Sequence, residues 1–163
     1  MRIVAVRGDI TQVDVDAVVN PSEAGSREIG MPVDELIERA GREVETETMA
    51  RGPIQVGEAM LTTGGQLRCK YVIHAPVGRG ADAPDPDDPE GVKKSTLAAL
   101  RCAAGGRLRS VAIPAFASGT GATRALISAL RDFDAEGGLE EVFIVGKNGE
   151  VVSAIKKEIG SGN

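Results

Sequence analysis

Aromatic residues, histidine and cysteine are scarce in this chain of 163 residues, and each scarcity excludes a class of function. Three Phe, one Tyr and no Trp leave few residues for a platform on which nucleic-acid bases stack. Cys69 and Cys102 form no C-x-x-C pattern, and with a single histidine a structural zinc site would need an unusual ligand set. We therefore expect two free core thiols, no bound metal and no cofactor.

Long hydrophobic runs are missing too. The apolar start from Met1 to Val6 is short and is followed at once by Arg7 and Asp9, unlike a signal peptide, and no segment reaches transmembrane length. These features predict a cytoplasmic protein with no membrane partner. The net charge of -5, from 19 basic and 24 acidic residues, gives no general attraction for nucleic acid, which we do not expect as a partner.

The length predicts one domain over residues 1–163, with ordinary hydrophobic (42%) and charged (26%) contents for a globular protein. One segment stands out, at about residues 78–91, where Pro84, Pro86 and Pro89 are interspersed with five acidic residues. Such a segment is too polar and too rich in proline for regular structure, so it predicts an exposed acidic loop. A metal site built from its carboxylates is the alternative.

Short apolar runs alternate with helical patterns along the chain. The runs are mostly uninterrupted, which is typical of strands covered on both faces, and they occupy residues 3–6, 17–19, 59–61, 71–73, 111–113 and 142–145. Apolar residues spaced three and four apart predict four helices. The first begins near Pro32 and contains Val33, Leu36, Ile37, Ala40 and Val44; the second spans about residues 91–105; the third contains Leu126, Ala129, Leu130 and Phe133; the last contains Val151, Val152, Ile155 and Ile159.

This alternation predicts an α/β fold, a three-layer α/β/α sandwich, in which ligands bind beyond the carboxyl ends of the strands. The candidate functional residues should therefore follow strands. Three segments do so: Gly8-Asp9-Ile10-Thr11, Asn20-Pro21-Ser22 and residues 117–122.

The last of these segments, Ser118-Gly119-Thr120-Gly121-Ala122, joins a predicted strand to a predicted helix. A glycine-rich turn at a helix N-terminus lets backbone N–H groups converge on an anion, so it favours phosphate binding. The dinucleotide fingerprint is excluded because Arg124 stands where its third glycine belongs, and a Walker loop is excluded because Glu141 stands where its first glycine belongs. A merely flexible turn remains the alternative.

Five segments in order resemble the macro domain family. They are Gly8-Asp9-Ile10-Thr11, VDAVVN at 15–20, VGEA at 56–59, KYVIHA at 70–75 and IPAFASGTG at 113–121. The resemblance implies a mixed, roughly six-stranded sheet in an α/β/α sandwich. It also implies binding of ADP-ribose or a related adenine diphosphate metabolite, and in some members hydrolysis of ADP-ribosyl esters or O-acetyl-ADP-ribose.

The resemblance also assigns residues to a ligand site. Asp9 and Ile10 would contact the adenine base and Asn20 the sugar. The diphosphate would lie between two loops that contain Gly30, Val33, Ser118, Gly119, Thr120, Gly121 and Ala122. Asp34 would orient or deprotonate a water molecule in the hydrolytic members.

Two of these residues keep a second interpretation, and a third polar residue, His74, needs one as well. Asp9 could cap a turn through neighbouring amides, and Asp34 could be a first-turn carboxylate that favours the helix dipole. His74 ends a predicted strand; we expect it to be a hydrogen-bonded core residue and not a general base.

The chain departs from the family pattern at three places. Glu23 stands where the family has a second asparagine, and Pro32, which lacks an N–H, lies in a loop whose only glycine is Gly30. Residues 145–148 offer no aromatic ring to stack on adenine. We therefore expect weaker or altered nucleotide binding; the alternative is a diverged scaffold that has lost the nucleotide and binds a protein or RNA.

Overall fold

The computed structural model describes residues 1–21, 35–51, 53–77, 88–115 and 119–161. Glu23, Gly30, Pro32, Val33, Asp34 and Ser118 lie outside the described residues, as do residues 78–87 of the predicted acidic loop. The described elements, in chain order, are β1 (Arg2–Arg7), η1 (Ile10–Gln12), β2 (Ala17–Asn20), α1 (Glu35–Ala40), α2 (Arg42–Ala50), β3 (Met60–Thr63), β4 (Tyr71–His74), α3 (Pro89–Gly105), β5 (Ser110–Pro114), α4 (Thr120–Asp134), β6 (Glu141–Gly146) and α5 (Gly149–Gly160).

The six described strands form one mixed sheet in the order β1-β6-β5-β2-β4-β3. All neighbours are parallel except β3, which pairs antiparallel with β4 at one edge. The carboxyl ends of the five parallel strands therefore lie along the same side of the sheet. In the register of β2 with β4, Asn20 lies opposite His74.

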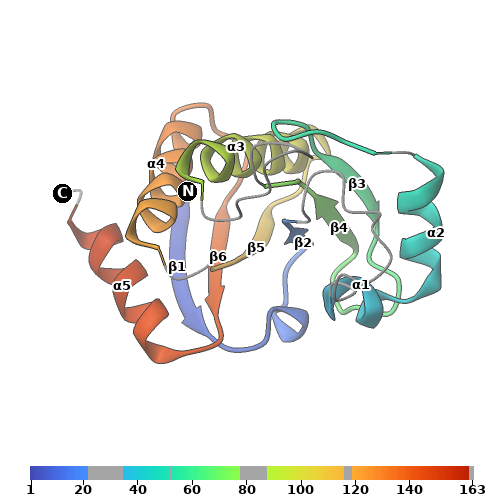
Figure 1. Cartoon of the computed structure of the whole chain (residues 1–163), viewed down its shortest axis with the longest axis horizontal. Helices are drawn as coiled ribbons and strands as arrows, with labels where there is room; N and C mark the ends of the chain where they lie inside the picture. The colour runs from blue at the N-terminus through green and yellow to red at the C-terminus, as the bar shows by residue number, and fades with distance from the viewer. Residues whose placement is uncertain (22–34, 52, 78–87, 116–118, 162–163) are drawn as a thin grey trace.

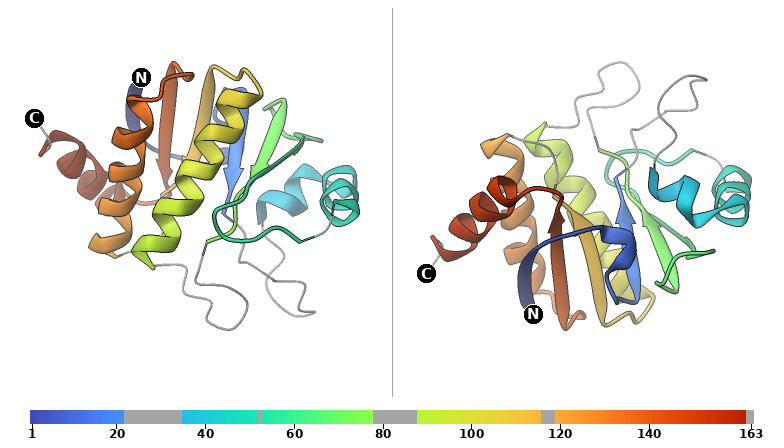
Figure 2. Two further views of the ribbon diagram at one scale, coloured as in Figure 1. Left: turned by 90° about the horizontal axis from the view of Figure 1, so that it is seen from above. Right: turned by 90° about the horizontal axis from the view of Figure 1, so that it is seen from below.

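Helices lie on both sides of this sheet, as Figure 1 shows. Figure 2 shows α3 and α4 in front of the strands in one view and η1 in front of them in the opposite view, while α5 lies beside β1, at one end of the strand order. Two apolar clusters fill the layers. The larger includes Ile73 and Ile113 with Leu100 of α3 and Leu126 of α4; the smaller is formed by Val15, Val18, Leu36, Cys69, Val72, Ala112 and Val145. Because successive strand residues point to opposite faces, uninterrupted apolar runs fill both clusters, and the predicted three-layer α/β/α sandwich is confirmed.

The predicted helix through Ala40 and Val44 is wrong in one respect, because the structure divides it into α1 and α2 at Gly41. Gly41 has a φ of 93°, which glycine adopts without the penalty that a side chain brings. The carbonyl of Ala40 accepts the N–H of Gln66, in the turn between β3 and β4, at 2.9 Å. This contact between distant segments accompanies the end of α1.

The predicted acidic loop also ends earlier than residue 91. Helix α3 begins at Pro89, a favoured first-turn residue, and the side chain of Asp88 caps it by accepting the Gly91 N–H at 2.8 Å. The last part of the acidic segment therefore starts a helix of 17 residues.

Candidate functional site

A cavity of about 250 Å³ lies at the carboxyl ends of β1, β5 and β6. Its lining is mostly apolar and comes from three strand ends and the start of α5: Gly8, Ile10, Pro114, Ala115, Val145, Gly146, Lys147, Asn148 and Val151. Ile10, which the resemblance assigns to the adenine base, thus lines this cavity. Residues 145–148 supply aliphatic and polar groups to the cavity but no ring.

Asp9 follows β1 and caps the η1 turn. Its Oδ1 accepts the Thr11 N–H at 2.9 Å and the Thr11 hydroxyl at 2.7 Å, and its Oδ2 accepts from Nη1 of Arg39 at 2.6 Å. The Thr11 hydroxyl, with smaller contributions from the Thr11 N–H and Arg39, holds the pKa of this carboxyl below its usual value. The side chain is 43% exposed, so a ligand can still approach it. The capping interpretation is confirmed, and the contact with adenine stays a prediction.

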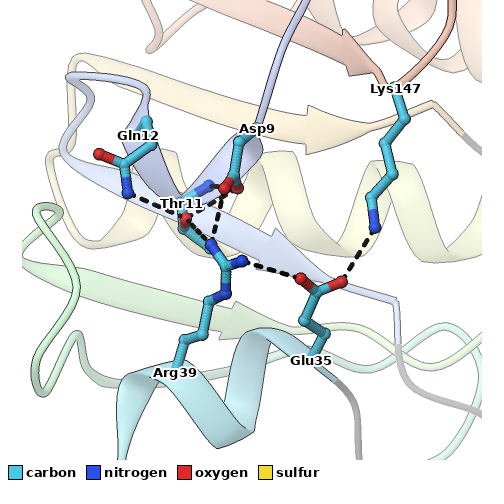
Figure 3. Close-up of polar contacts among 6 residues, drawn as sticks. All are labelled: Asp9, Thr11, Gln12, Glu35, Arg39 and Lys147. Carbon is cyan, nitrogen blue, oxygen red and sulfur yellow. Dashed lines mark hydrogen bonds and ion pairs between the residues drawn. The ribbon is translucent and has the colours of Figure 1, made fainter.

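Asp9 is the end of a chain of ion pairs beside the cavity (Figure 3). Arg39 also contacts Glu35 Oε1, at 3.0 Å from Nη2, and Glu35 Oε2 accepts from Nζ of Lys147 at 2.9 Å. The Lys147 ammonium is the main reason that the pKa of Glu35 is lowered. The ion pairs connect the turn after β1, helix α1 and Lys147, the residue after β6, which lines the cavity.

Sequence reasoning missed Glu35, Arg39 and Lys147. The i, i+4 spacing of Glu35 and Arg39 was a usable signal, because such pairs face each other on a helix. The contacts of Arg39 with Asp9 and of Lys147 with Glu35 join residues 30 and 112 positions apart, and no local spacing indicates them.

The N-terminus of α4 follows β5. Gly119 is its N-cap in an extended conformation, without a side-chain cap, and the N–H of Thr123 is bonded to the Gly119 carbonyl at 3.1 Å. The N–H groups of Thr120, Gly121 and Ala122 precede that bond, so they have no carbonyl partner within the helix. A Cβ on Gly121 would lie 3.2 Å from Cγ of Pro89, which shows that the starts of α3 and α4 pack closely.

Asn20 and His74 form a buried polar pair at the ends of β2 and β4, and each is only 2% exposed. Nδ2 of Asn20 lies 3.3 Å from Nδ1 of His74. Oδ1 of Asn20 has no hydrogen-bond partner in the part of the chain that the structure describes. Burial lowers the pKa of His74 to about 4, so the ring is neutral at pH 7. The expectation of a hydrogen-bonded core histidine is confirmed.

The strand order arranges these features in a row along the carboxyl side of the sheet. The cavity covers the ends of β1, β6 and β5, α4 begins after β5, and Asn20 ends the next strand, β2. The row combines an apolar cavity, a helix N-terminus and a buried amide acceptor. The fold is that of an α/β/α protein, and in this class of fold ligands bind beyond the carboxyl ends of the strands.

Comparison with known proteins identifies the family of this chain. The family model described as Macro domain matches residues 19–129, and the chain belongs to this family. An uncharacterized protein of Aquifex aeolicus (strain VF5) is 40% identical over 168 residues, covering 98% of this chain and 99% of that protein.

Solved structures give the same result. The Trypanosoma brucei macrodomain in complex with ADP is similar with a TM-score of 0.82 and 26% identity, over 98% of this chain and 69% of that one. The same macrodomain in complex with ADP-ribose gives a TM-score of 0.81 and 28% identity, over 96% and 68%. The predicted family and fold are confirmed.

No helix among the described residues is both long and apolar enough to cross a bilayer.

Proposed function

We propose that this macro domain binds ADP-ribose, or a closely related adenine diphosphate metabolite, along the carboxyl side of its sheet. The observation that carries the proposal is the row of cavity, α4 N-terminus and Asn20 on neighbouring strand ends. Base, diphosphate and second sugar follow one another in ADP-ribose in the same order. The similarity to a T. brucei macrodomain in complex with ADP-ribose supports the assignment.

The purine occupies the apolar cavity, with Ile10 in its lining and Asp9 beside it. A carboxylate accepts hydrogen bonds only, so Asp9 favours the amine of adenine over the carbonyl of guanine. This carboxylate is ionised at neutral pH, and its contacts with Thr11 and Arg39 lower its pKa further.

The diphosphate lies against the N-terminus of α4. The positive end of the helix dipole and the N–H groups of Thr120, Gly121 and Ala122 favour an anion there. In the same proposal Ser118, Gly30 and Val33, which lie outside the described residues, complete the diphosphate loops. The absence of a ring at residues 145–148 predicts weak base stacking and hence modest affinity.

Isothermal titration calorimetry with ADP-ribose, ADP and GDP tests the proposal. We expect heat of binding with ADP-ribose and ADP, little with GDP, and loss of binding in Asp9→Ala. Asp134→Ala is the matched control, because Asp134 is a carboxylate that pairs with the N-terminal ammonium at the far end of α4. If the unaltered chain gives no heat with ADP-ribose and ADP, the proposal is wrong and the diverged scaffold that binds a protein or RNA is favoured.

Hydrolysis of ADP-ribosyl esters or O-acetyl-ADP-ribose is a second function of the same site. Its support is the position of Asp34 directly before Glu35, whose carboxylate contacts the cavity residue Lys147. Turnover of O-acetyl-ADP-ribose by the unaltered chain should be lost in Asp34→Ala with ADP-ribose binding retained. Equal rates in the two proteins would remove Asp34 from catalysis.

The cytoplasmic location stays a prediction.

A further inference from the structure

A buried polar cluster surrounds the imidazole ring of His74, the single histidine of the chain. Nδ1 faces Nδ2 of Asn20 at 3.3 Å on one side. On the other side Nε2 lies 2.9 Å from the hydroxyl oxygen of Thr62 and 3.5 Å from that of Thr48. Thr62 belongs to β3 and Thr48 to α2, so the ring connects the end of β2 with the outer strand and a helix.

The hydroxyl protons of both threonines are used elsewhere. Thr48 Oγ1 donates to the carbonyl of Val44 at 2.7 Å, and Thr62 Oγ1 donates to the carbonyl of Thr63 at 3.1 Å. A hydroxyl has one proton to donate, so toward His74 both oxygens can only accept. We therefore assign the ring proton to Nε2, an assignment in which the Thr62 hydroxyl donates to the Thr63 carbonyl and not to the ring.

A proton on Nε2 determines what the other side of the ring does. The buried ring is neutral, since burial lowers the pKa of His74 to about 4, and a neutral imidazole with a proton on Nε2 has a bare Nδ1. The bare Nδ1 accepts from the side-chain NH2 group of Asn20. This contact turns the amide so that Oδ1, which has no partner among the described residues, is left as an acceptor.

We propose that His74 is a positioning residue, which fixes the side-chain amide of Asn20 so that Oδ1 accepts a hydrogen bond from a ligand hydroxyl group. The inference rests on the proposed function and makes it more specific. A sugar hydroxyl can donate to Oδ1, whereas an ionised phosphate has only acceptor oxygens. Oδ1 of Asn20 lies at the end of β2, next to the strand that leads into α4. A ligand whose diphosphate is at the α4 N-terminus must therefore extend into a sugar to reach this acceptor.

The charged groups that act on the ring are Glu47 of α2 and Arg51, which follows the helix directly. Glu47 stabilises the protonated ring and Arg51 opposes it, and the two contact each other at 3.6 Å. Oε2 of Glu47 also accepts the N–H of Thr63 at 2.9 Å, so this carboxylate is already bonded. Burial outweighs Glu47, and the ring stays neutral down to mildly acidic pH.

Nitrogen NMR of protein labelled with ¹⁵N-histidine tests the first step, and one histidine gives an unambiguous spectrum. We expect the neutral tautomer with the proton on Nε2 at pH 7, and protonation only near pH 4. A proton on Nδ1 at pH 7 would overturn the inference, because the ring would then donate to Asn20 and turn its amide around. This readout does not depend on any ligand.

Calorimetry with Thr62→Val tests the second step. Valine has the shape of threonine but removes the nearer acceptor of the Nε2 proton and leaves only the Thr48 oxygen at 3.5 Å, so the other tautomer and the turned amide become populated. We expect affinity for ADP-ribose to fall about tenfold, the size of one lost hydrogen bond, while affinity for ADP stays the same because ADP has no second sugar. Thr62→Ser keeps the hydroxyl and should bind like the unaltered chain.

The outcomes separate the two proposals. If the unaltered chain binds neither nucleotide, the proposed function is wrong, and so is the role of Asn20 toward a ligand, whatever the tautomer. If the unaltered chain binds ADP-ribose and ADP, and Thr62→Val binds each of them with the same affinity as the unaltered chain, the proposed function stands and the positioning role of His74 is overturned.

Discussion

Nη1 of Arg39 lies 2.6 Å from Oδ2 of Asp9 and connects helix α1 to the turn after β1. The other oxygen of the same carboxylate accepts two hydrogen bonds from Thr11. The group that we assign to base recognition is thus held on both oxygens before any ligand arrives. Such preorganisation lowers the entropic cost of binding.

Replacing Asp9 with asparagine should change which base is preferred. The amide oxygen can still accept from Thr11, but its NH2 group can donate to the carbonyl of guanine, so the preference for ADP over GDP should fall about tenfold. Calorimetry with both nucleotides measures the ratio. Arg39→Gln, the control, should alter both affinities in parallel. A ratio that stays constant in Asp9→Asn contradicts the assignment of the base site.

A ring at position 147 should strengthen adenine binding. Lys147 lines the cavity that we assign to the purine, and stacking a base on an aromatic side chain contributes about 1–3 kcal/mol. Lys147→Phe should therefore bind ADP about tenfold more tightly. Lys147→Met loses the same ion pair with Glu35 without adding a ring, so it is the matched control. Equal affinities in the two variants would show that the base lies elsewhere.

The Gly119 N-cap allows stability and binding to be separated. Serine or aspartate at this position should each raise the free energy of unfolding by a few tenths of a kcal/mol, because glycine supplies no cap. The carboxylate of Gly119→Asp would also accept from the N–H groups assigned to the diphosphate and repel its negative charge. Affinity for ADP-ribose should therefore fall by more than tenfold in Gly119→Asp and much less in Gly119→Ser. Urea unfolding and calorimetry measure the two effects. Tight binding by Gly119→Asp would contradict the diphosphate site.

Stability should decrease with acid over a window set by His74. Its pKa is lowered from 6.5 to about 4, so the unfolded chain binds the proton first and the contribution of this residue is lost as the pH falls from about 6.5 toward 4. The loss amounts to roughly 3 kcal/mol over the whole window. Urea unfolding followed by circular dichroism is suitable, because the chain has no Trp.

Two features separate this effect from others. The pKa values of Asp9 and Asp16 are lowered from 3.8, so their contributions are lost below the window of His74. The pKa values of the exposed carboxyls of Glu35, Glu136 and Glu140 are lowered from 4.5, so the loss that they cause belongs to the acidic end of the window and remains when His74 is replaced. His74→Gln cannot titrate and should lose the His74 contribution to the dependence between pH 6.5 and 4. If the same dependence persists in that variant, another group is responsible.

The break between α1 and α2 should be sensitive to side chains on two glycines. Gly41→Ala forces a residue with Cβ to a φ of 93°, and near neighbours are only the flexible side chain of Gln66, so a loss of about 1 kcal/mol in unfolding free energy is expected. Gly65→Ala should cost more, because its Cβ would lie 2.2 Å from the carbonyl oxygen of Ala40. Urea unfolding of both variants measures the order, and a larger loss for Gly41→Ala would contradict it.

The sheet could be predicted from the sequence because its parallel strands are buried on both faces. Val18 and Val19, for example, point to opposite faces and are each 1% exposed, so an uninterrupted apolar run marks the strand. The end of α1 has one local signal, Gly41, because a glycine in the left-handed region often ends a helix. The hydrogen bond from the Gln66 N–H to the Ala40 carbonyl could not be predicted, since the two segments meet only in the folded sheet.

The candidate site divides in the same way. Asp9, Ile10 and Asn20 each follow or end a strand, so strand ends and the family motif located them. Arg39 and Lys147 required the fold, because their partners come from other elements. The pairing of Asn20 with His74 depends on the register of β2 with β4, which neither segment specifies alone.

A crystal structure of the chain with ADP-ribose tests the central claim most directly. We predict the purine in the cavity with its amine toward Asp9, and the diphosphate on the N–H groups of Thr120 to Ala122. A hydroxyl of the second ribose should lie within hydrogen-bond distance of Asn20 Oδ1. An empty sheet edge at saturating ADP-ribose, or a nucleotide bound away from the α4 N-terminus, would contradict it.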